Sequence, residues 1–277
     1  MPARPETPAT RALAWLYCSP KQRALFAALC GLERQIGASL SAGLDHQLAH
    51  TRLAWWREEC ARCAQGRASH PLTREISARL APVDTPSLEG LAGFVDTAVW
   101  DLATATFETR RELTSYCERW SAAMIEPLAC CGEPTLERAE ARTLGASLRE
   151  IELLLALASE ARGGRLRIPL DELAQVKAAP EELAQPPWQS GLTALIEDRH
   201  RQLRAALRAS VAALSPAAQS ALRGVIVWAA LDCAHSVRAQ ALLPRASLGR
   251  EPQALFDGWR AWRAARRADA GRGLGFA

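Results

Sequence analysis

Three arginines lie close together in a glycine-containing turn, at Arg162, Arg165 and Arg167. Guanidinium groups can hold a phosphate directly through paired hydrogen bonds, so this turn could bind an anionic headgroup. An ordinary solvent-exposed turn explains the same residues equally well. A long apolar run before the turn ends at Glu160, so a carboxylate directly precedes the arginines. We therefore consider Glu160 and the three arginines together as one candidate binding site.

Two other pairs of residues have the spacing that metal ligands use. Cys60 and Cys63 form a Cys-x-x-Cys pair, but a zinc site needs a second such pair, and Cys130-Cys131 has the wrong spacing. We interpret the first pair as small apolar side chains inside a helix. His46 and His50 are one helical turn apart without an evident third ligand. We expect surface histidines there, with a metal pair as the alternative.

Apolar residues recur at steps of three and four, which indicates helices along the chain. Leu25, Leu29, Leu32 and Ile36 form one such stripe. Alanine, leucine and arginine dominate while β-branched and aromatic residues are scarce, and this mixture favours helix over strand. We predict an all-α fold: a leader over residues 1–18, a single helical domain over residues 19–268, and a flexible tail over residues 269–277.

Glycine, proline and serine divide this domain into helices. We predict them at about residues 20–36, 44–64, 70–80, 88–111, 112–131, 135–161, 188–214, 216–243 and 251–267, with a short one after Pro169. Ser19-Pro20 is typical of the beginning of a helix, because proline is tolerated in the first helical turn.

The composition limits the classes of function. A net charge of +4, almost wholly from arginine, permits contact with phosphates or anionic membranes without requiring it. The arginines are spread over many helices with few aromatics between them, so we expect no nucleic acid partner.

No run approaches the ~18 uncharged apolar residues of a membrane span. The first ten residues lack a signal peptide's apolar stretch, and the eight cysteines are expected to be reduced. We expect a cytoplasmic protein, with membrane association as the alternative.

The last predicted helix is amphipathic. Leu255, Trp259 and Trp262 form one stripe with Phe256 beside it, and arginines surround the stripe. Aromatic residues with flanking arginines are typical of a helix on a membrane surface, so peripheral membrane contact through residues 251–267 is one interpretation. We expect the stripe to dock on the protein's own core instead.

Several landmarks, in order over roughly residues 20–240, resemble the squalene/phytoene synthase family. They are Arg23-Ala24-Leu25-Phe26-Ala27, Leu53-Ala54-Trp55-Trp56-Arg57-Glu58-Glu59 with Gly66 and His70-Pro71, Asp101-Leu102 with Tyr116-Cys117, Leu144-Gly145, and Gly164-Arg165 through Pro169. The resemblance implies the isoprenoid synthase fold, a bundle of helices around a central apolar cavity. It also implies prenyl diphosphate substrates and two aspartate-rich motifs that hold Mg²⁺, a cation that prefers carboxylate and phosphate oxygens.

The chain departs from that family pattern at the metal-binding carboxylates. The first motif falls on residues 35–41, which contain no carboxylate, and the second falls on Ala156, Ser159 and Glu160, of which only Glu160 is acidic. The candidate metal or diphosphate site comprises Glu33, Asp101, Glu152, Glu160, Arg162, Arg165 and Arg167. The candidate cavity residues are Trp55, Trp56 and Tyr116.

The retained landmarks and missing aspartates lead to three hypotheses. The first is a catalytically degenerate family member that needs no cofactor and binds an isoprenoid or lipid or serves as an assembly factor with a protein partner. The chain is similar in this respect to the complex I assembly factor branch of the family. The alternative is an active Mg²⁺-dependent prenyltransferase that condenses prenyl diphosphates, with the four acids as metal ligands. A helical scaffold without a ligand is the third interpretation.

Overall fold

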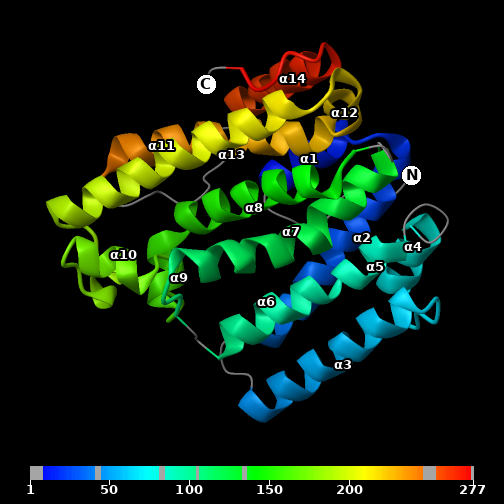
Figure 1. The fold of residues 1–277 in the computed structure, drawn as a ribbon, viewed down its shortest axis with the longest axis horizontal. Coiled ribbons are helices and arrows are strands. Elements are labelled where there is room, and N and C mark those ends of the chain that lie inside the picture. Colours follow the sequence, from blue (N-terminus) through cyan, green and yellow to red (C-terminus); the bar gives the residue numbers. More distant parts are fainter. Residues whose placement is uncertain are drawn as a thin grey trace.

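The computed structural model describes residues 9–40, 45–80, 85–103, 106–132, 136–245 and 254–275, and every regular element in them is a helix (Figure 1). This confirms the predicted all-α fold. The elements, with 3₁₀ helices labelled η, are α1 Ala9–Tyr17, α2 Pro20–Gly37, η1 Ala38–Leu40, α3 His46–Ala64, α4 Pro71–Leu80, α5 Thr85–Gly90, α6 Ala92–Leu102, α7 Arg110–Gly132, α8 Arg138–Leu155, α9 Leu157–Arg162, α10 Leu170–Gln175, η2 Pro180–Ala184, α11 Ser190–Ala213, α12 Pro216–Ala221, α13 Arg223–Leu242 and α14 Ala254–Asp269.

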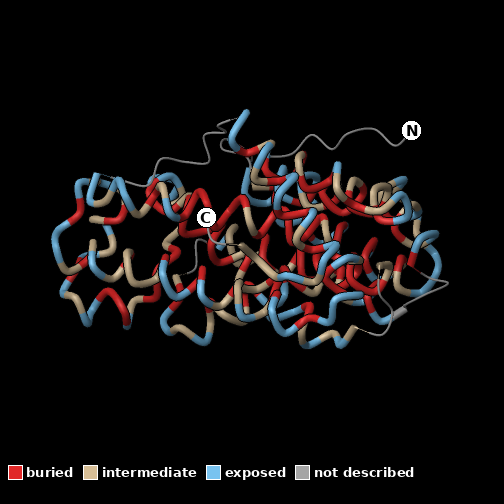
Figure 2. The backbone as a smooth tube through the Cα atoms, turned by 90° about the horizontal axis from the view of Figure 1, so that it is seen from above, coloured by how far each residue is buried: buried red, intermediate tan, exposed pale blue. Residues whose placement is uncertain are grey.

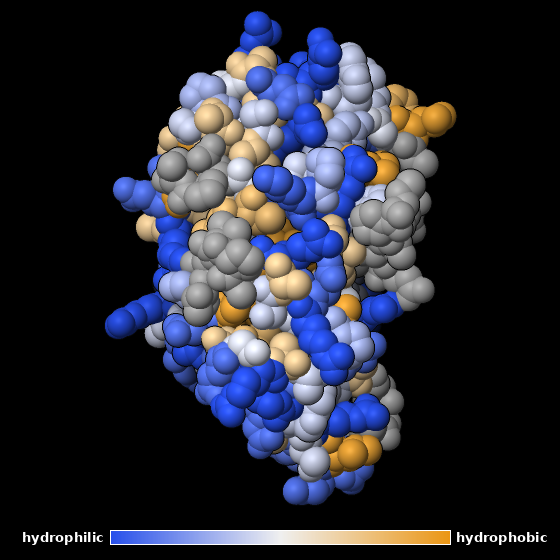
Figure 3. All heavy atoms as spheres, turned by 90° about the vertical axis from the view of Figure 1, so that its right-hand side faces the viewer, coloured by the Kyte–Doolittle hydropathy of each residue, from blue (hydrophilic) through white to orange (hydrophobic). Residues whose placement is uncertain are grey.

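The long helices α7 and α8 pack along each other in the middle of the molecule. Helices α2 and α6 contact α7, while α11 and α13 contact α8, so apolar faces from both sides meet at this pair. Trp228 lies edge-on to both Phe26 and Trp120, with ring centroids 6.0 and 5.8 Å apart. Buried backbone runs through the interior in Figure 2, and hydrophilic side chains predominate on the face in Figure 3. The main core therefore lies around this helix pair, with a separate small apolar cluster between α13 and α14.

Three predicted helices are interrupted in the structure. The prediction over residues 88–111 spans parts of α5, α6 and α7, and a break falls at Leu91 between Gly90 and Gly93, where glycine lowers helix propensity. The prediction over residues 135–161 divides into α8 and α9 at Ala156. The helix predicted over residues 216–243 divides into α12 and α13 at Leu222. Apolar periodicity continues across each break, which is why the sequence pattern predicted single helices.

The assignment of residues 1–18 to a leader is wrong for the part that the structure describes. Residues 9–17 form α1, which packs against α13. Trp15 is buried and its indole Nε1 donates to the Arg23 carbonyl at 3.0 Å. Helix α2 then begins at the expected place, with Ser19 as its N-cap and Gln22 completing a capping box. The domain therefore begins by residue 9 rather than residue 19.

Helix α14 covers the outer edge of the molecule beyond α12 and α13 (Figure 1). Its buried face includes Ala261, Ala264, Ala265 and Ala268. The expectation that its aromatic stripe docks on the core is wrong, because small alanines allow closer helix packing and the stripe points outward. Beyond α14, the Gly273 amide donates to the side chain of Gln219 at 2.8 Å, so this part of the predicted tail contacts α12.

Close packing between α7 and α8 gives a direct test of the fold. A Cβ atom added at Gly145 would lie 2.0 Å from the Ser121 hydroxyl and 2.6 Å from Ile125, so Gly145→Ala must push the two helices apart. We expect it to lower the free energy of unfolding by about 1–3 kcal/mol in urea titrations. Gly258→Ala is the matched control, because nothing lies within 4 Å of a Cβ there, and it should be neutral or stabilising. Equal stability of the two variants would contradict this packing.

Candidate functional site: a charged cavity

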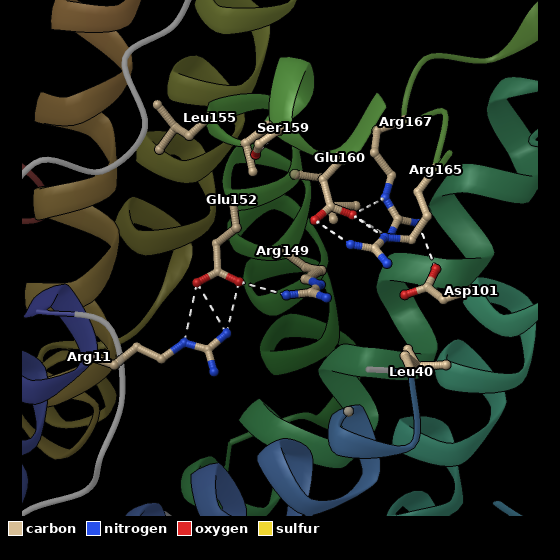
Figure 4. A pocket seen from close by; sticks show the side chains of 13 residues that line it. Arg11, Leu40, Asp101, Arg149, Glu152, Leu155, Ser159, Glu160, Arg165 and Arg167 are labelled. Carbon is tan, nitrogen blue, oxygen red and sulfur yellow. Dashed lines mark hydrogen bonds and ion pairs between the residues drawn. The ribbon is translucent and has the colours of Figure 1, made fainter. Parts of the chain in front are cut away.

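A cavity of about 550 Å³ opens between α2, η1, α6, α8 and α9. Seven charged residues from across the chain line it: Arg11, Asp101, Arg149, Glu152, Glu160, Arg165 and Arg167 (Figure 4). The family resemblance implies an apolar cavity, but seven of the thirteen residues that line this cavity are charged. Such a lining suits an anionic ligand group better than a bare hydrocarbon chain.

The two segments where the family resemblance placed metal-binding motifs lie on this cavity. Gly37 and Leu40 line one side, and Ala156 and Ser159 line the other. None of the four carries a carboxylate; residue 41, the last of the first segment, lies outside the described residues. The fold therefore brings the motif positions together, with uncharged side chains at these four and a carboxylate at Glu160.

One group of charges surrounds Arg11 of α1. Its Nη2 donates to Glu152 at 2.9 Å, and its Nη1 pairs with Glu33 of α2. Arg149 donates to the same Glu152 carboxylate at 3.0 Å. Glu33 also accepts the Trp120 indole N–H at 2.7 Å. Two guanidinium groups, two carboxylates and the Trp120 indole thereby link α1, α2, α7 and α8 beside the cavity.

Aromatic rings support the Arg11 side chain. Its guanidinium carbon lies 4.6 Å from the centre of the Trp228 ring and 5.5 Å from that of Trp120, and only 5% of Arg11 is exposed. Burial opposes a charge, but Glu152 and Glu33 outweigh it and raise the pKa of Arg11 well above its usual value. Arg11 therefore stays a cation that is fixed in position.

A second group of charges surrounds Glu160 of α9. Its Oε2 accepts hydrogen bonds at 2.8 Å from both Arg165 and Arg167. Arg167 also donates to Asp101 of α6 at 2.7 Å, and the Tyr116 hydroxyl donates to the other oxygen of Asp101 at 3.1 Å. Arg149 lies between this group and the Arg11 group in Figure 4. The positive φ of 79° at Gly164 forms the turn that returns Arg165 and Arg167 to the cavity.

The surroundings of these groups shift their pKa values. Burial alone would raise the pKa of Glu160, but hydrogen bonds and charge from Arg165 and Arg167 lower it from 4.5 to about 2. Burial raises the pKa of Tyr116 to about 12 in spite of the nearby arginines. At neutral pH Glu160 is therefore ionised beside the guanidinium groups of Arg165 and Arg167, while Tyr116, which contacts Asp101, is a neutral phenol.

The side chains present do not fit an Mg²⁺ cluster. Each of the three lining carboxylates already accepts a hydrogen bond from at least one guanidinium group. Within the described parts of the chain, no three His, Cys, Asp or Glu side chains are grouped so that they could hold a metal ion. A magnesium site needs several oxygen ligands in near-octahedral array, and here arginine hydrogen atoms occupy the positions that a cation would take.

Most of the candidate site residues lie where the sequence predicted a common site. Asp101, Glu152, Glu160, Arg165 and Arg167 all line the cavity. Glu33 lies behind it, paired with Arg11. Tyr116 is buried against Asp101 and lines a small neighbouring cavity of about 130 Å³.

Three candidates lie elsewhere. Arg162 is exposed at the end of α9 and does not belong to the cavity lining. Trp56 packs in the main core, while Trp55 is 42% exposed on α3. Both tryptophans lie near His70, with ring centroids 6.1 and 4.9 Å from its imidazole. The prediction of a cavity role for the two tryptophans is therefore not supported by their positions.

Sequence reasoning missed Arg11 and Arg149. Arg11 was assigned to a leader because the preceding residues are rich in proline and threonine. Arg149 precedes Glu152 by one helical turn, a spacing at which opposite charges meet on a helix, and this signal could have identified it.

The cysteine and histidine pairs occupy ordinary structural positions. Cys60 and Cys63 are buried thiols on α3, and burial raises their pKa values to about 12 and about 11. His46 and His50 are exposed, with their Nε2 atoms 3.0 Å apart. Neither pair contributes to the charged cavity.

The helical arrangement around this cavity is an isoprenoid synthase fold. It is similar to a crystal structure of a dehydrosqualene synthase in complex with ligand, at 15% identity and a TM-score of 0.72, covering 94% of this chain and 90% of that one. It is also similar to the squalene synthase HpnC from Alicyclobacillus acidocaldarius, at 17% identity and a TM-score of 0.64, covering 83% and 87%. At these identities the likeness shows a shared fold. No curated protein matches the sequence.

The sequence itself matches the squalene/phytoene synthase family over residues 6–244. The chain therefore belongs to this family, as its landmarks predicted. The match includes α1 and ends just after α13, so α14 lies outside it.

The shifted pKa of Glu160 predicts how stability depends on pH. Because the folded-state pKa lies below 4.5, the Glu160 pairs stabilise the fold above that pH and are lost as pH falls toward about 2. Glu160→Gln should cost about 2 kcal/mol at pH 7 and much less near pH 2.5, measured by urea unfolding. The control Glu75→Gln, in an exposed pair with Arg79 on α4, should change stability by less than about 0.5 kcal/mol. A constant difference across pH would contradict the assignment.

The buried position of Arg11 predicts a large effect of its removal. Arg11→Ala leaves two acids, Glu152 and Glu33, short of a counter-charge, and it should destabilise the protein by about 3–5 kcal/mol. Arg52→Ala, at an exposed position on α3, is the control and should change stability by less than about 0.5 kcal/mol. Thermal and urea unfolding measure both. Equal stability of the two variants would mean that α1 contributes little to the cavity.

Proposed function

We propose that this protein binds the diphosphate group of a prenyl diphosphate, or a similar anionic isoprenoid headgroup, through arginine rather than Mg²⁺. In this proposal the chain is a catalytically degenerate family member that does not condense its ligands. The observation that carries the proposal is the pairing of each carboxylate in the cavity with a guanidinium group.

The guanidinium groups of the cavity support an anionic ligand. Four of them line it, together with three carboxylates, and Glu33 lies behind Arg11 as a fourth. Arginine binds phosphate oxygens through paired, charge-assisted hydrogen bonds, so it can replace a metal ion as the counter-charge. The removal of carboxylates at positions 156 and 159 also leaves room that a diphosphate could occupy.

Arg165 is the best placed group to contact such a ligand. Its side chain is 29% exposed, compared with 3% for Arg167. Both arginines donate to the same oxygen of Glu160, so Glu160 keeps one partner if Arg165 turns toward a phosphate. Arg165 can therefore exchange a carboxylate for a ligand without leaving a buried acid unpaired.

The class of ligand is inferred from the family and from the neighbouring structures. Those neighbours are described as a dehydrosqualene synthase with a bound ligand and a squalene synthase, and they share this fold. Core side chains surround the charged cavity, with Leu153 and Leu155 in its wall, so an apolar chain could extend from the headgroup along them.

An active Mg²⁺-dependent prenyltransferase is the second candidate. Asp101, Glu152 and Glu160 line one cavity with Glu33 close behind, although they are not grouped tightly enough to hold a metal ion as they stand. Metal binding would require these acids to exchange their arginine partners for Mg²⁺. Release of diphosphate from farnesyl diphosphate with Mg²⁺ present would establish this activity and contradict the proposal.

The proposal predicts binding that depends on Arg165. Calorimetry with farnesyl thiodiphosphate, a slowly reacting analogue, in EDTA should detect binding to the unmodified protein. Arg165→Gln should weaken it about tenfold or more, the effect of losing a charge-assisted hydrogen bond. Arg162→Gln removes the same charge from the same turn outside the cavity, so it should bind like the parent. No binding by the parent would overturn the proposal and favour an assembly factor with a protein partner.

A further inference from the structure

The outer face of α14 exposes four large apolar side chains. Leu255 is 89% exposed, Phe256 64%, Trp259 52% and Trp262 54%. Leu255, Trp259 and Trp262 recur at steps of four and three, so they form one stripe along the helix, with Phe256 beside it. Tryptophan exposed in this way is uncommon on a surface that only water contacts, because each ring leaves a large apolar area unburied.

The protein holds this face outward. On the opposite side of α14 the alanine face packs against Val227 and Leu231 of α13. Asp257 is 1% exposed, and its carboxylate lies 3.1 Å from the His235 imidazole of α13 and 3.3 Å from the guanidinium of Arg260. These buried contacts fix the rotation of the helix, so its aromatic side chains cannot turn inward.

The charges on the outer face are all positive. Both acids of α14 face other partners: Asp257 is buried, and Asp269 pairs with Arg223 at 3.1 Å. Arg263 and Arg266 are exposed, and neither pairs with a carboxylate in the described parts of the chain. The guanidinium of Arg263 lies 5.3 Å from the centre of the Trp259 ring, so cation and aromatic ring form one surface.

A small cavity of about 150 Å³ lies on the flank of this surface, between α14 and α13. Its lining combines Trp259 with three arginines, Arg260, Arg263 and Arg267. Arg260 and Arg267 are held by Asp257 and by the carbonyl of Gly273, at 3.3 and 3.2 Å. Two held guanidinium groups, with that of Arg263 beside them, could bind a phosphate group in a cavity of this size.

We propose that α14 binds the surface of a membrane that contains anionic phospholipids. Leu255, Phe256, Trp259 and Trp262 enter the boundary between headgroups and acyl chains, and the arginines contact lipid phosphates. This contact needs no membrane span, and no described helix is long and apolar enough to be one.

Charge distinguishes this occupant from a second copy of the chain. A two-fold dimer through α14 would bring the same surface of each copy together and place arginines against arginines. An anionic membrane supplies the opposite charge and an apolar layer together, which matches both parts of the surface.

The test is co-sedimentation of the full-length protein with vesicles. Binding to vesicles of phosphatidylcholine with phosphatidylglycerol should exceed binding to phosphatidylcholine alone, and it should weaken as salt rises. Arg263→Gln should weaken it about fivefold, and Arg263→Gln with Arg266→Gln further. The pair Trp259→Ala and Trp262→Ala should abolish most of the binding. All these positions are exposed, so we expect the variants to fold, and circular dichroism checks this.

Matched controls come from helices on other parts of the surface. Trp55→Ala removes another exposed tryptophan and Arg74→Gln another exposed arginine, and both should bind vesicles like the parent. Equal binding to neutral and anionic vesicles, or an equal loss in the controls, would overturn the proposal. So would a dimer in solution that the two α14 tryptophan substitutions convert to monomer.

Discussion

The structure depends most on the ion pairs that Arg11 makes with Glu152 and Glu33 deep in the bundle. Buried carboxylates need a counter-charge, because an isolated ion in a poorly solvated interior is strongly disfavoured. Here a guanidinium group from α1 provides that charge for both Glu152 and Glu33. This one contact joins the N-terminal helix, the cavity and the central helix pair, so charge balance at the site and stability of the fold are coupled.

This family member has no carboxylate at most of the expected metal-binding positions. Its fold is held by helix packing and by arginine–carboxylate pairs instead. Packing of α7 against α8, with Gly145 close to Ser121 and Ile125, needs no metal. Neutral side chains at positions 156 and 159 remove charge, and the arginines balance the acids that remain. The result is a preformed cavity whose cations are fixed side chains. Such a site suits recognition of an anion better than assembly of several ions around a leaving group.

The sequence predicted most of the helices because apolar spacing is a local property. It also predicted that Asp101, Glu160, Arg165 and Arg167 belong to one site, since the Gly164 turn and the family landmarks locate them. Arg11 could not be found in this way, because its partners lie 22 and 141 residues away. The outward position of Trp259 and Trp262 was also missed. An amphipathic stripe reveals which residues share a face, but here the alanines of α14, not the aromatics, fit closely against α13.

The central claim is that arginine has replaced Mg²⁺ as the counter-charge of the cavity. The most direct measurement is the affinity for farnesyl thiodiphosphate in EDTA compared with that in saturating Mg²⁺. This account predicts binding in EDTA, with equal or weaker affinity when Mg²⁺ is added, because the metal then competes with arginine for the diphosphate. Binding that appears only with Mg²⁺ would contradict the account, since it would mean that the acids release their arginine partners and assemble a metal site.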